Sequence, residues 1–275
     1  MKYLDYAVAA AKIRKLTIRA LADFGYGHIG GSMSVCDLYG VLYSGVLNID
    51  SKNPNKIDRD WVVMSKGHSG PALYSALAYA GFFPISDLKT LNANATNLPS
   101  HCDRLKTCGI DLSTGSLGQG ISLGMGAALG NKLQGIDSYT YIILGDGELQ
   151  EGQIWEGVQF AAHHRLDNVI IFIDNNHKQL DGTIEEVCRQ FDLAMKFSAF
   201  GWEAIRIDGH NTDSIYEAIL QAKENNGPVV IIMDTIKGQG CSFAELVAFN
   251  HYMIISQEMS EEACKEIDRR LETQL

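Results

Sequence analysis

Two short polar stretches of the chain each follow an apolar run that is typical of a buried strand. Asp146 stands in "GDGELQEG" after the run "YTYII", and Asn176 stands in "DNNHK" after the run "NVIIFI". If the two runs are neighbouring parallel strands, about 4.8 Å apart, their carboxyl ends bring both side chains to one point. Carboxylate and amide oxygens suit Mg²⁺ or Ca²⁺, and Mg²⁺ completes its shell with phosphate oxygens and water. The spacing therefore indicates a site for a metal ion and a diphosphate.

The residues around Asp146 favour the same interpretation. Gly145 and Gly147 let the backbone come close to a ligand, and the predicted helix 153–166 offers its amino-terminal amides to an anion. A "GDG" triplet by itself is more often a turn, and an aspartate before a helix is more often a cap. The second polar stretch, at the end of a second predicted strand, favours a metal site over these two readings.

Apolar runs alternate with helical patterns along most of the chain. Strands that are apolar throughout and lie between helices are typical of a doubly wound α/β fold, with a mostly parallel sheet and helices on both faces. Residues 25–34 and 92–117 are predicted as loops, and residues 261–275 as a solvated helix. The predicted strands are 61–68 with its terminal turn, 139–144, 168–173, 203–207 and 228–235, and the clearest predicted helices are 1–25, 118–135, 153–166 and 212–225.

Composition excludes several classes of protein. With 23 Lys and Arg against 33 Asp and Glu, the net charge of −10 argues against binding to nucleic acid or to an anionic membrane surface. The first helical pattern carries basic residues throughout, which is unlike a signal peptide and too polar to span a bilayer. The six cysteines form no C-x-x-C pair and suit reduced thiols. We therefore expect a cytoplasmic protein.

Several motifs, in the same order along nearly the whole chain, resemble those of the transketolases. They are "GHIGGSMS", "SKGHSGPALYSAL", "STGSLGQG", "GDGELQEGQIWEG" followed by "LDNVIIFIDNN", "LDG" and "TIKGQGCSF". The resemblance implies a thiamine diphosphate-binding fold, with residues 1–275 as a single diphosphate-binding domain that ends in a helical tail from about 255. It also implies thiamine diphosphate and Mg²⁺ or Ca²⁺ as cofactors.

The resemblance assigns roles to named residues. The side chains of Asp146 and Asn176 and the backbone carbonyl of Lys178 match ligands of the metal ion. His28 and His101 match histidines that line the substrate channel, and His251 matches one that reaches both the diphosphate and the substrate. The remaining matches are His68 and the backbone of Gly147 at the diphosphate, Gly118 over the aminopyrimidine, Lys237 near the cofactor, and Glu151 and Glu156 at a subunit interface that connects paired active sites.

The segment around His251 departs from the family pattern. Transketolases usually have Trp before this histidine and Gly after it, whereas this chain has Asn250 and Tyr252. We therefore expect the local geometry at His251 to differ.

The resemblance covers only the diphosphate-binding part of a complete transketolase. We therefore expect the N-terminal subunit of a split transketolase, in which a C-terminal subunit supplies the pyrimidine-binding half and the assembly is a dimer of heterodimers. The expected reaction moves a two-carbon ketol unit from a ketose phosphate to an aldose phosphate, as in the pentose phosphate pathway, and requires the partner. A specialised sugar pathway stays open, as do two other classes: the α subunit of a 2-oxo acid dehydrogenase and a non-catalytic binding homologue.

Overall fold

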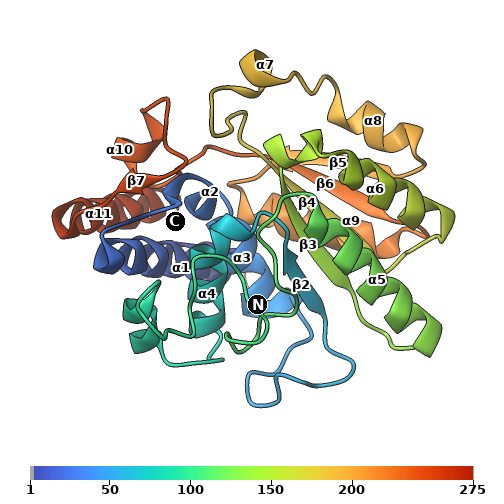
Figure 1. Ribbon diagram of the computed structural model, residues 1–275, viewed down its shortest axis with the longest axis horizontal. Helices are drawn as coiled ribbons and strands as arrows, with labels where there is room; N and C mark the ends of the chain where they lie inside the picture. Colours follow the sequence, from blue (N-terminus) through green and yellow to red (C-terminus); the bar gives the residue numbers. More distant parts are fainter. Residues whose placement is uncertain (1–2, 275) are drawn as a thin grey trace.

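A computed structural model describes residues 3–274, and residues 1, 2 and 275 of the predicted 1–275 domain lie outside the described part. Its centre is a five-stranded parallel sheet with strand order β2-β3-β4-β6-β5 (Figure 1). The strands are β2 (Trp61–Met64), β3 (Thr140–Gly145), β4 (Val169–Asn175), β5 (Glu203–Asp208) and β6 (Val229–Asp234). All five predicted strands are present, and the predicted α/β fold class is confirmed.

Helices cover both faces of the sheet, which explains why its inner strands are apolar along most of their length (Figure 1). Along β3, Tyr141 and Ile143 pack into one core and Ile142 and Leu144 into the other, because successive side chains point to opposite faces. The first core includes α1 (Tyr3–Phe24), α3 (Cys36–Val41), α4 (Gly70–Tyr79) and α9 (Thr212–Glu224), and the second includes α5 (Gln119–Gln134), α6 (Gly152–His163) and α8 (Leu193–Ala199).

The predicted loop 25–34 contains regular structure. It holds β1 (Tyr26–Gly27) and the fully buried helix α2 (Ile29–Met33). The prediction of a loop was wrong here because α2 is short, has no side-chain cap and owes its stability to burial, which the glycine-rich sequence does not reveal. By contrast, the predicted loop 92–117 contains no helix or strand.

The C-terminal helix α11 (Gln257–Gln274) is present, but the prediction of a solvated helix for 261–275 was wrong. Ala263, Cys264 and Ile267 are buried in the core that also holds α1. The sequence of α11 is rich in charged residues, so the narrow apolar stripe at helical spacing was not recognised. Among the described residues, no helix is both long enough and apolar enough to cross a bilayer.

Shorter elements complete the fold. They are η1 (Leu42–Val46), η2 (Gly67–Ser69), η3 (Ile85–Thr90), η4 (Gly147–Gln150), α7 (Ile184–Val187), α10 (Ser242–Glu245) and β7 (Met253–Ile254). Strand β7 pairs antiparallel with β1, so that the segment after α1 and the segment before α11 lie side by side (Figure 1).

The carboxyl ends of β3 and β4 lie next to each other, as the spacing of their polar residues predicts. Gly145 pairs with Asp174 in the parallel register, and the Asp146 amide donates to the Asp174 carbonyl at 3.2 Å. The polar stretches after both strands therefore meet at one edge of the sheet.

Candidate active site

A pocket of about 290 Å³ lies at the carboxyl edge of the sheet. This is where open parallel sheets bind their ligands. Nine of the residues to which the resemblance assigns a role line it: His28, His68, His101, Asp146, Gly147, Asn176, Lys178, Lys237 and His251. They come from separate segments of the chain, which the fold brings together.

The side chains after β3 and β4 are held by short local hydrogen bonds. One Asp146 carboxylate oxygen accepts from the Gly147 amide at 2.8 Å, and the other accepts from the His177 amide at 2.6 Å. The Asn176 Nδ2 donates to the Asp174 carboxylate at 2.9 Å, while its Oδ1 accepts from the Lys178 amide at 3.1 Å. The Asn176 amide oxygen and the Asp146 carboxylate therefore have fixed orientations in the pocket wall.

Asp146 forms no ion pair among the described residues, and Lys237 acts on it only at longer range. Burial and then the charge of Asp174 raise the pKa of Asp146 to about 7. Both causes disfavour the ionised form, and a divalent cation beside the carboxylate would reverse them. The donor set of Asp146, Asn176 Oδ1 and the Lys178 carbonyl consists of hard oxygens, so these residues fit Mg²⁺ or Ca²⁺.

Asp174 is a buried hub that the sequence did not single out. Its carboxylate accepts from Lys66 Nζ at 2.6 Å and from Ser34 Oγ at 2.7 Å, in addition to Asn176 and Thr235. Burial opposes its charge, but Lys66 and these hydrogen bonds keep the pKa of Asp174 below its ordinary value. Asp174 thus orients Asn176 and fixes Lys66 at the pocket wall.

Four histidines form one cluster in the pocket. The His28 ring lies 5.3 Å from His68, 5.6 Å from His101 and 5.2 Å from His251, and His68 lies 4.7 Å from His251. Burial and then the charge of His101 lower the pKa of His28 to about 4, and burial followed by Lys237 lowers the pKa of His251 to about 3. The pKa of His68 is also lowered, by burial and then Lys66. The three rings are therefore neutral at pH 7.

This charge state predicts a pH dependence of stability. A histidine whose folded pKa is depressed contributes stability above its unfolded pKa of about 6.5, and this stability is lost as the pH falls towards the folded value. The cofactor-free chain should therefore lose stability between pH 6.5 and about 4. His251→Gln should reduce the fall in thermal midpoint between pH 7 and pH 5 by a few degrees, as measured by scanning calorimetry. An unchanged fall would contradict the buried, neutral state of His251.

The pocket wall also fits an anion such as a diphosphate. Lys66 and Lys237 both line it, and burial lowers the pKa of Lys237 to about 8. Among the described residues, Gln179 Nε2 and His251 Nδ1 are buried without a hydrogen-bond partner. A Cβ on Gly147 would lie 3.0 Å from the Gln179 side chain, so the backbone here approaches a neighbour closely. The pocket wall therefore combines two ammonium groups, side-chain nitrogens without a hydrogen-bond partner and a glycine backbone. Such groups suit the binding of phosphate oxygens.

Lys237 and Lys178 lie together at the metal end of the pocket. The Lys237 ammonium donates to the Lys178 carbonyl, the expected third metal ligand, at 3.0 Å. Lys237 therefore lies beside the carbonyl that is expected to bind the metal ion.

Glu148 is a second buried carboxylate that the sequence did not single out. It accepts from Ser65 Oγ at 2.5 Å, from the Gly118 amide at 3.0 Å and from the Gly145 amide at 3.2 Å. These donors belong to three motifs, so Glu148 ties the ends of β2 and β3 to the loop before α5. Burial raises the pKa of Glu148.

Removal of the Glu148 carboxylate should destabilise the fold. Glu148→Ala leaves three buried donors without an acceptor, and each such loss costs about 1–3 kcal/mol. We expect a decrease of roughly 3 kcal/mol in the free energy of unfolding, measured by urea denaturation, and a smaller decrease for Glu148→Gln, which keeps one acceptor oxygen. Glu185→Ala, at an exposed position, is the control. Equal stability of Glu148→Ala and wild type would contradict this role.

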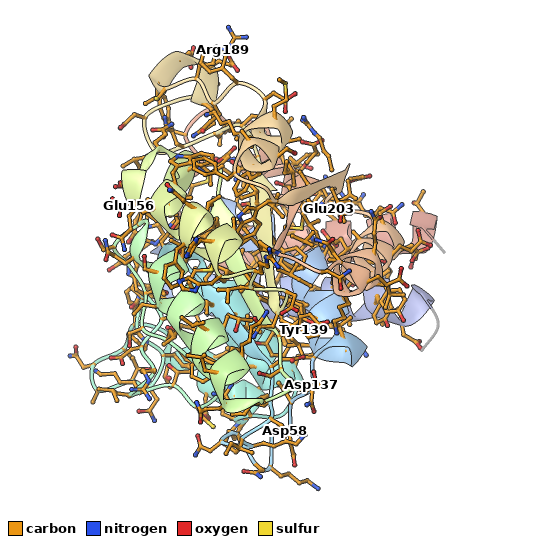
Figure 2. The ribbon with its side chains drawn as sticks, turned by 90° about the vertical axis from the view of Figure 1, so that its right-hand side faces the viewer. Asp58, Asp137, Tyr139, Glu156, Arg189 and Glu203 are labelled. Carbon is orange, nitrogen blue, oxygen red and sulfur yellow. The ribbon has the colours of Figure 1, made fainter. Side chains whose placement is uncertain are left out.

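Three predicted residues do not line the pocket in the described structure. Gly118 caps α5 in the left-handed region with φ 83°, and a Cβ there would lie 2.8 Å from the Glu151 Cβ. Its neighbours Gly115 and Leu117 line the pocket instead. Glu151 and Glu156 are exposed, and Figure 2 shows Glu156 at the outer margin of the molecule.

The unusual neighbours of His251 have different environments. Asn250 is buried, and its side chain donates to the carbonyls of Lys237 and Ala244 at 2.9 and 2.8 Å. Its backbone carbonyl accepts from the Gly30 amide at 3.1 Å. Asn250 therefore joins the Lys237 segment to α2, while Tyr252 is half-exposed.

Comparison with known proteins identifies the family. The family described as "Transketolase, thiamine diphosphate binding domain" matches residues 6–258. The chain belongs to the transketolase family. The resemblance seen in the motifs is thereby confirmed, and thiamine diphosphate is the cofactor of this domain.

Transketolase relatives fall into two lengths. The chain is 47% identical to the 6-deoxy-6-sulfo-D-fructose transketolase subunit SqwG of Clostridium sp. (strain MSTE9), covering 97% of both proteins. It is 34% identical to one of the apulose-4-phosphate transketolase subunits of Phocaeicola vulgatus, covering 95% of this chain and 93% of that one. It is also 34% identical to human transketolase, but spans only 42% of that protein.

Solved transketolase structures share the fold. The structure from Campylobacter jejuni superposes with a TM-score of 0.90 at 30% identity, over 98% of this chain and 43% of that one. The structure from Leishmania mexicana gives the same TM-score at 28% identity, over 97% of this chain and 41% of that one. The chain thus spans less than half the length of these transketolases.

Proposed function

We propose that the chain is the diphosphate-binding subunit of a two-chain transketolase, which moves a two-carbon ketol unit from a ketose to an aldose. The observation that supports this most strongly is the convergence of the Asp146, Asn176 and Lys178 oxygens with four histidines in one pocket of a transketolase-family chain. Binding alone would not need a cluster of neutral histidines beside a cofactor site.

Thiamine diphosphate supplies the chemistry that breaks and forms the carbon–carbon bond. Asp146, Asn176 and the Lys178 carbonyl would hold the divalent cation, Mg²⁺ or Ca²⁺. His68, Lys66 and the Gly147 backbone would bind the diphosphate, with Lys237 and His251 nearby. The loop that contains Gly118 would lie over the aminopyrimidine.

His28, His101 and His251 would act on the substrate. A neutral imidazole can donate or accept a hydrogen bond, so these rings can orient sugar hydroxyls and accept or return a proton. Their lowered pKa values keep this capacity at neutral pH, because a protonated ring could only donate. The partly buried position of these rings would also limit the access of water to the reacting carbonyl.

A second polypeptide would complete each active site. The chain matches almost the full length of relatives that are themselves named as subunits, and less than half of human transketolase. We infer that a C-terminal transketolase subunit supplies the pyrimidine-binding half, in a dimer of heterodimers with Glu151 and Glu156 at the interface. The six free cysteines suit assembly in the reducing cytoplasm.

The donor we infer is 6-deoxy-6-sulfo-D-fructose rather than a pentose phosphate. The relative that is 47% identical over nearly its full length is named for this sugar. Removal of the two-carbon unit from this six-carbon ketose leaves a four-carbon aldose that keeps the sulfonate, and an aldose phosphate accepts the unit.

The test is a donor comparison with the assembled pair. The chain and its partner, with Mg²⁺ and thiamine diphosphate, are supplied with ribose 5-phosphate as the acceptor and one donor at a time: 6-deoxy-6-sulfofructose, fructose 6-phosphate, xylulose 5-phosphate or pyruvate. We expect the highest kcat/KM with the sulfonated ketose and no reaction with pyruvate. A preference for the phosphorylated ketoses would contradict the proposed donor. Turnover of pyruvate alone would contradict the proposed reaction.

A further inference from the structure

A short ribbon brings two distant aromatic residues to the rim of the active site. Strand β1 pairs with β7 through Tyr26 with Ile254 and Gly27 with Met253. The residues that flank these strands, His28 and Tyr252, therefore become neighbours. Their ring centroids lie 4.9 Å apart at an interplanar angle of 77°.

This edge-to-face contact completes the surroundings of His28. The other ring neighbours of His28 are the three pocket histidines, His68, His101 and His251. Tyr252 is the one phenol ring that contacts the cluster in the described part of the chain, and it does not line the pocket itself. Any influence of Tyr252 on the substrate would therefore pass through His28.

Tyr252 is itself supported from outside. Its ring lies 5.5 Å from Tyr26, which in turn lies 4.3 Å from Phe24 at the end of α1. Hydrogen bonds fix the backbone on both sides: the Ile255 amide donates to the Gly25 carbonyl at 2.9 Å, and the Gly30 amide donates to the Asn250 carbonyl at 3.1 Å. The Tyr252 ring is thus braced against His28, although 47% of its surface is exposed.

We propose that Tyr252 is a positioning residue that holds the His28 ring in the histidine cluster during ketol transfer. The proposal rests on the proposed function. The three histidines that surround the His28 ring in the pocket are polar. Tyr252 is therefore the one aromatic side chain that covers this ring from outside the pocket in the described structure, and it shields the ring from water. Without that ring, His28 can turn outwards and its separation from the substrate changes, whereas the metal and diphosphate groups stay in place.

Kinetics of the assembled pair test this role. Tyr252→Ala should lower kcat/KM for the ketose donor by about 3- to 10-fold, the range expected for loss of an aromatic contact, and leave the KM for thiamine diphosphate unchanged. Tyr252→Phe keeps the ring and should restore the wild-type value. Phe249→Ala removes a 70% exposed ring from the same segment that has no ring contact with His28 in the described structure, and is the matched control.

A second measurement on the chain alone does not depend on activity. The His28 ring is followed by NMR during a pH titration of wild type, Tyr252→Ala and Tyr252→Phe. The groups that face it are His68, His101 and His251, with Lys66 and Lys237 in the same pocket. Burial keeps the pKa of His28 low, so Tyr252→Ala should raise it towards 6.5 and Tyr252→Phe should not.

The two measurements separate the inference from the proposed function. An inactive wild-type pair would count against the proposed function, and the titration would still decide whether Tyr252 positions His28. An unchanged His28 titration in Tyr252→Ala would overturn the inference. So would an active pair in which Tyr252→Ala has the wild-type kcat/KM for the donor.

Discussion

Asp146→Ala should lower the kcat of the assembled pair by on the order of 10³-fold, because it removes the one carboxylate that we assign to the metal ion. The raised pKa of Asp146 shows how poorly the protein alone stabilises its charge. The binding of a cation at this point therefore depends strongly on the Asp146 carboxylate. Calorimetric titration with Mg²⁺ and thiamine diphosphate should show loss of tight binding in the variant.

A matched carboxylate serves as the control for Asp146. Asp137 is exposed, lies just before β3 rather than just after it, and is labelled at the surface in Figure 2. Asp137→Ala should keep wild-type kcat and cofactor affinity. Wild-type turnover by Asp146→Ala would contradict the metal site and would favour a non-catalytic role for the pocket.

His68→Ala should weaken the binding of thiamine diphosphate more than it lowers kcat. His68 is buried beside Lys66 and His251, and its assigned partner is an anion. A hydrogen bond to a charged group is worth about 1.5–3 kcal/mol, so the KM for thiamine diphosphate should rise by about 10- to 150-fold. Saturating cofactor should recover much of the wild-type rate.

The controls for His68 separate the hydrogen bond from the ring. His68→Asn keeps a donor and should lie between wild type and His68→Ala. His163 lies on α6 away from the pocket, so His163→Ala should have no effect. If the KM for the cofactor in His68→Ala equals that of wild type, His68 does not bind the diphosphate.

The sequence predicted the sheet and its ligand edge well for a physical reason. Strands buried on both faces are apolar along most of their length, so β3 and β4 stood out from their surroundings. The polar residues that follow each strand then had one possible meeting place, the carboxyl edge. Asp146 and Asn176 could be paired on this ground alone.

The supporting residues could not be predicted in the same way. Asp174 accepts from Lys66, 108 positions away, and Glu148 accepts from Ser65, 83 positions away. Such contacts depend on how the elements pack, and neither carboxylate stands out by its local pattern. The signal was nevertheless present, because Lys66, Glu148 and Asp174 all lie within two residues of a residue that the motifs had singled out.

The buried helix α2 and the stripe on α11 show the same limit. Local propensity gave no reason to expect a helix in "IGGSM", and the charges of α11 concealed the three positions that pack on the core. In both, tertiary burial decides the structure. The position of Tyr252 against His28 belongs to this class too, since it depends on the pairing of β1 with β7.

The most direct test of the central claim is the rate of ketol transfer from 6-deoxy-6-sulfofructose and from xylulose 5-phosphate, with Mg²⁺ and thiamine diphosphate, by the chain alone and with its C-terminal partner. We predict no turnover by the chain alone and turnover by the mixture that is lost when either cofactor is removed. Full activity of the isolated chain, or a stable, cofactor-loaded mixture that transfers no ketol unit from any ketose, would contradict the account.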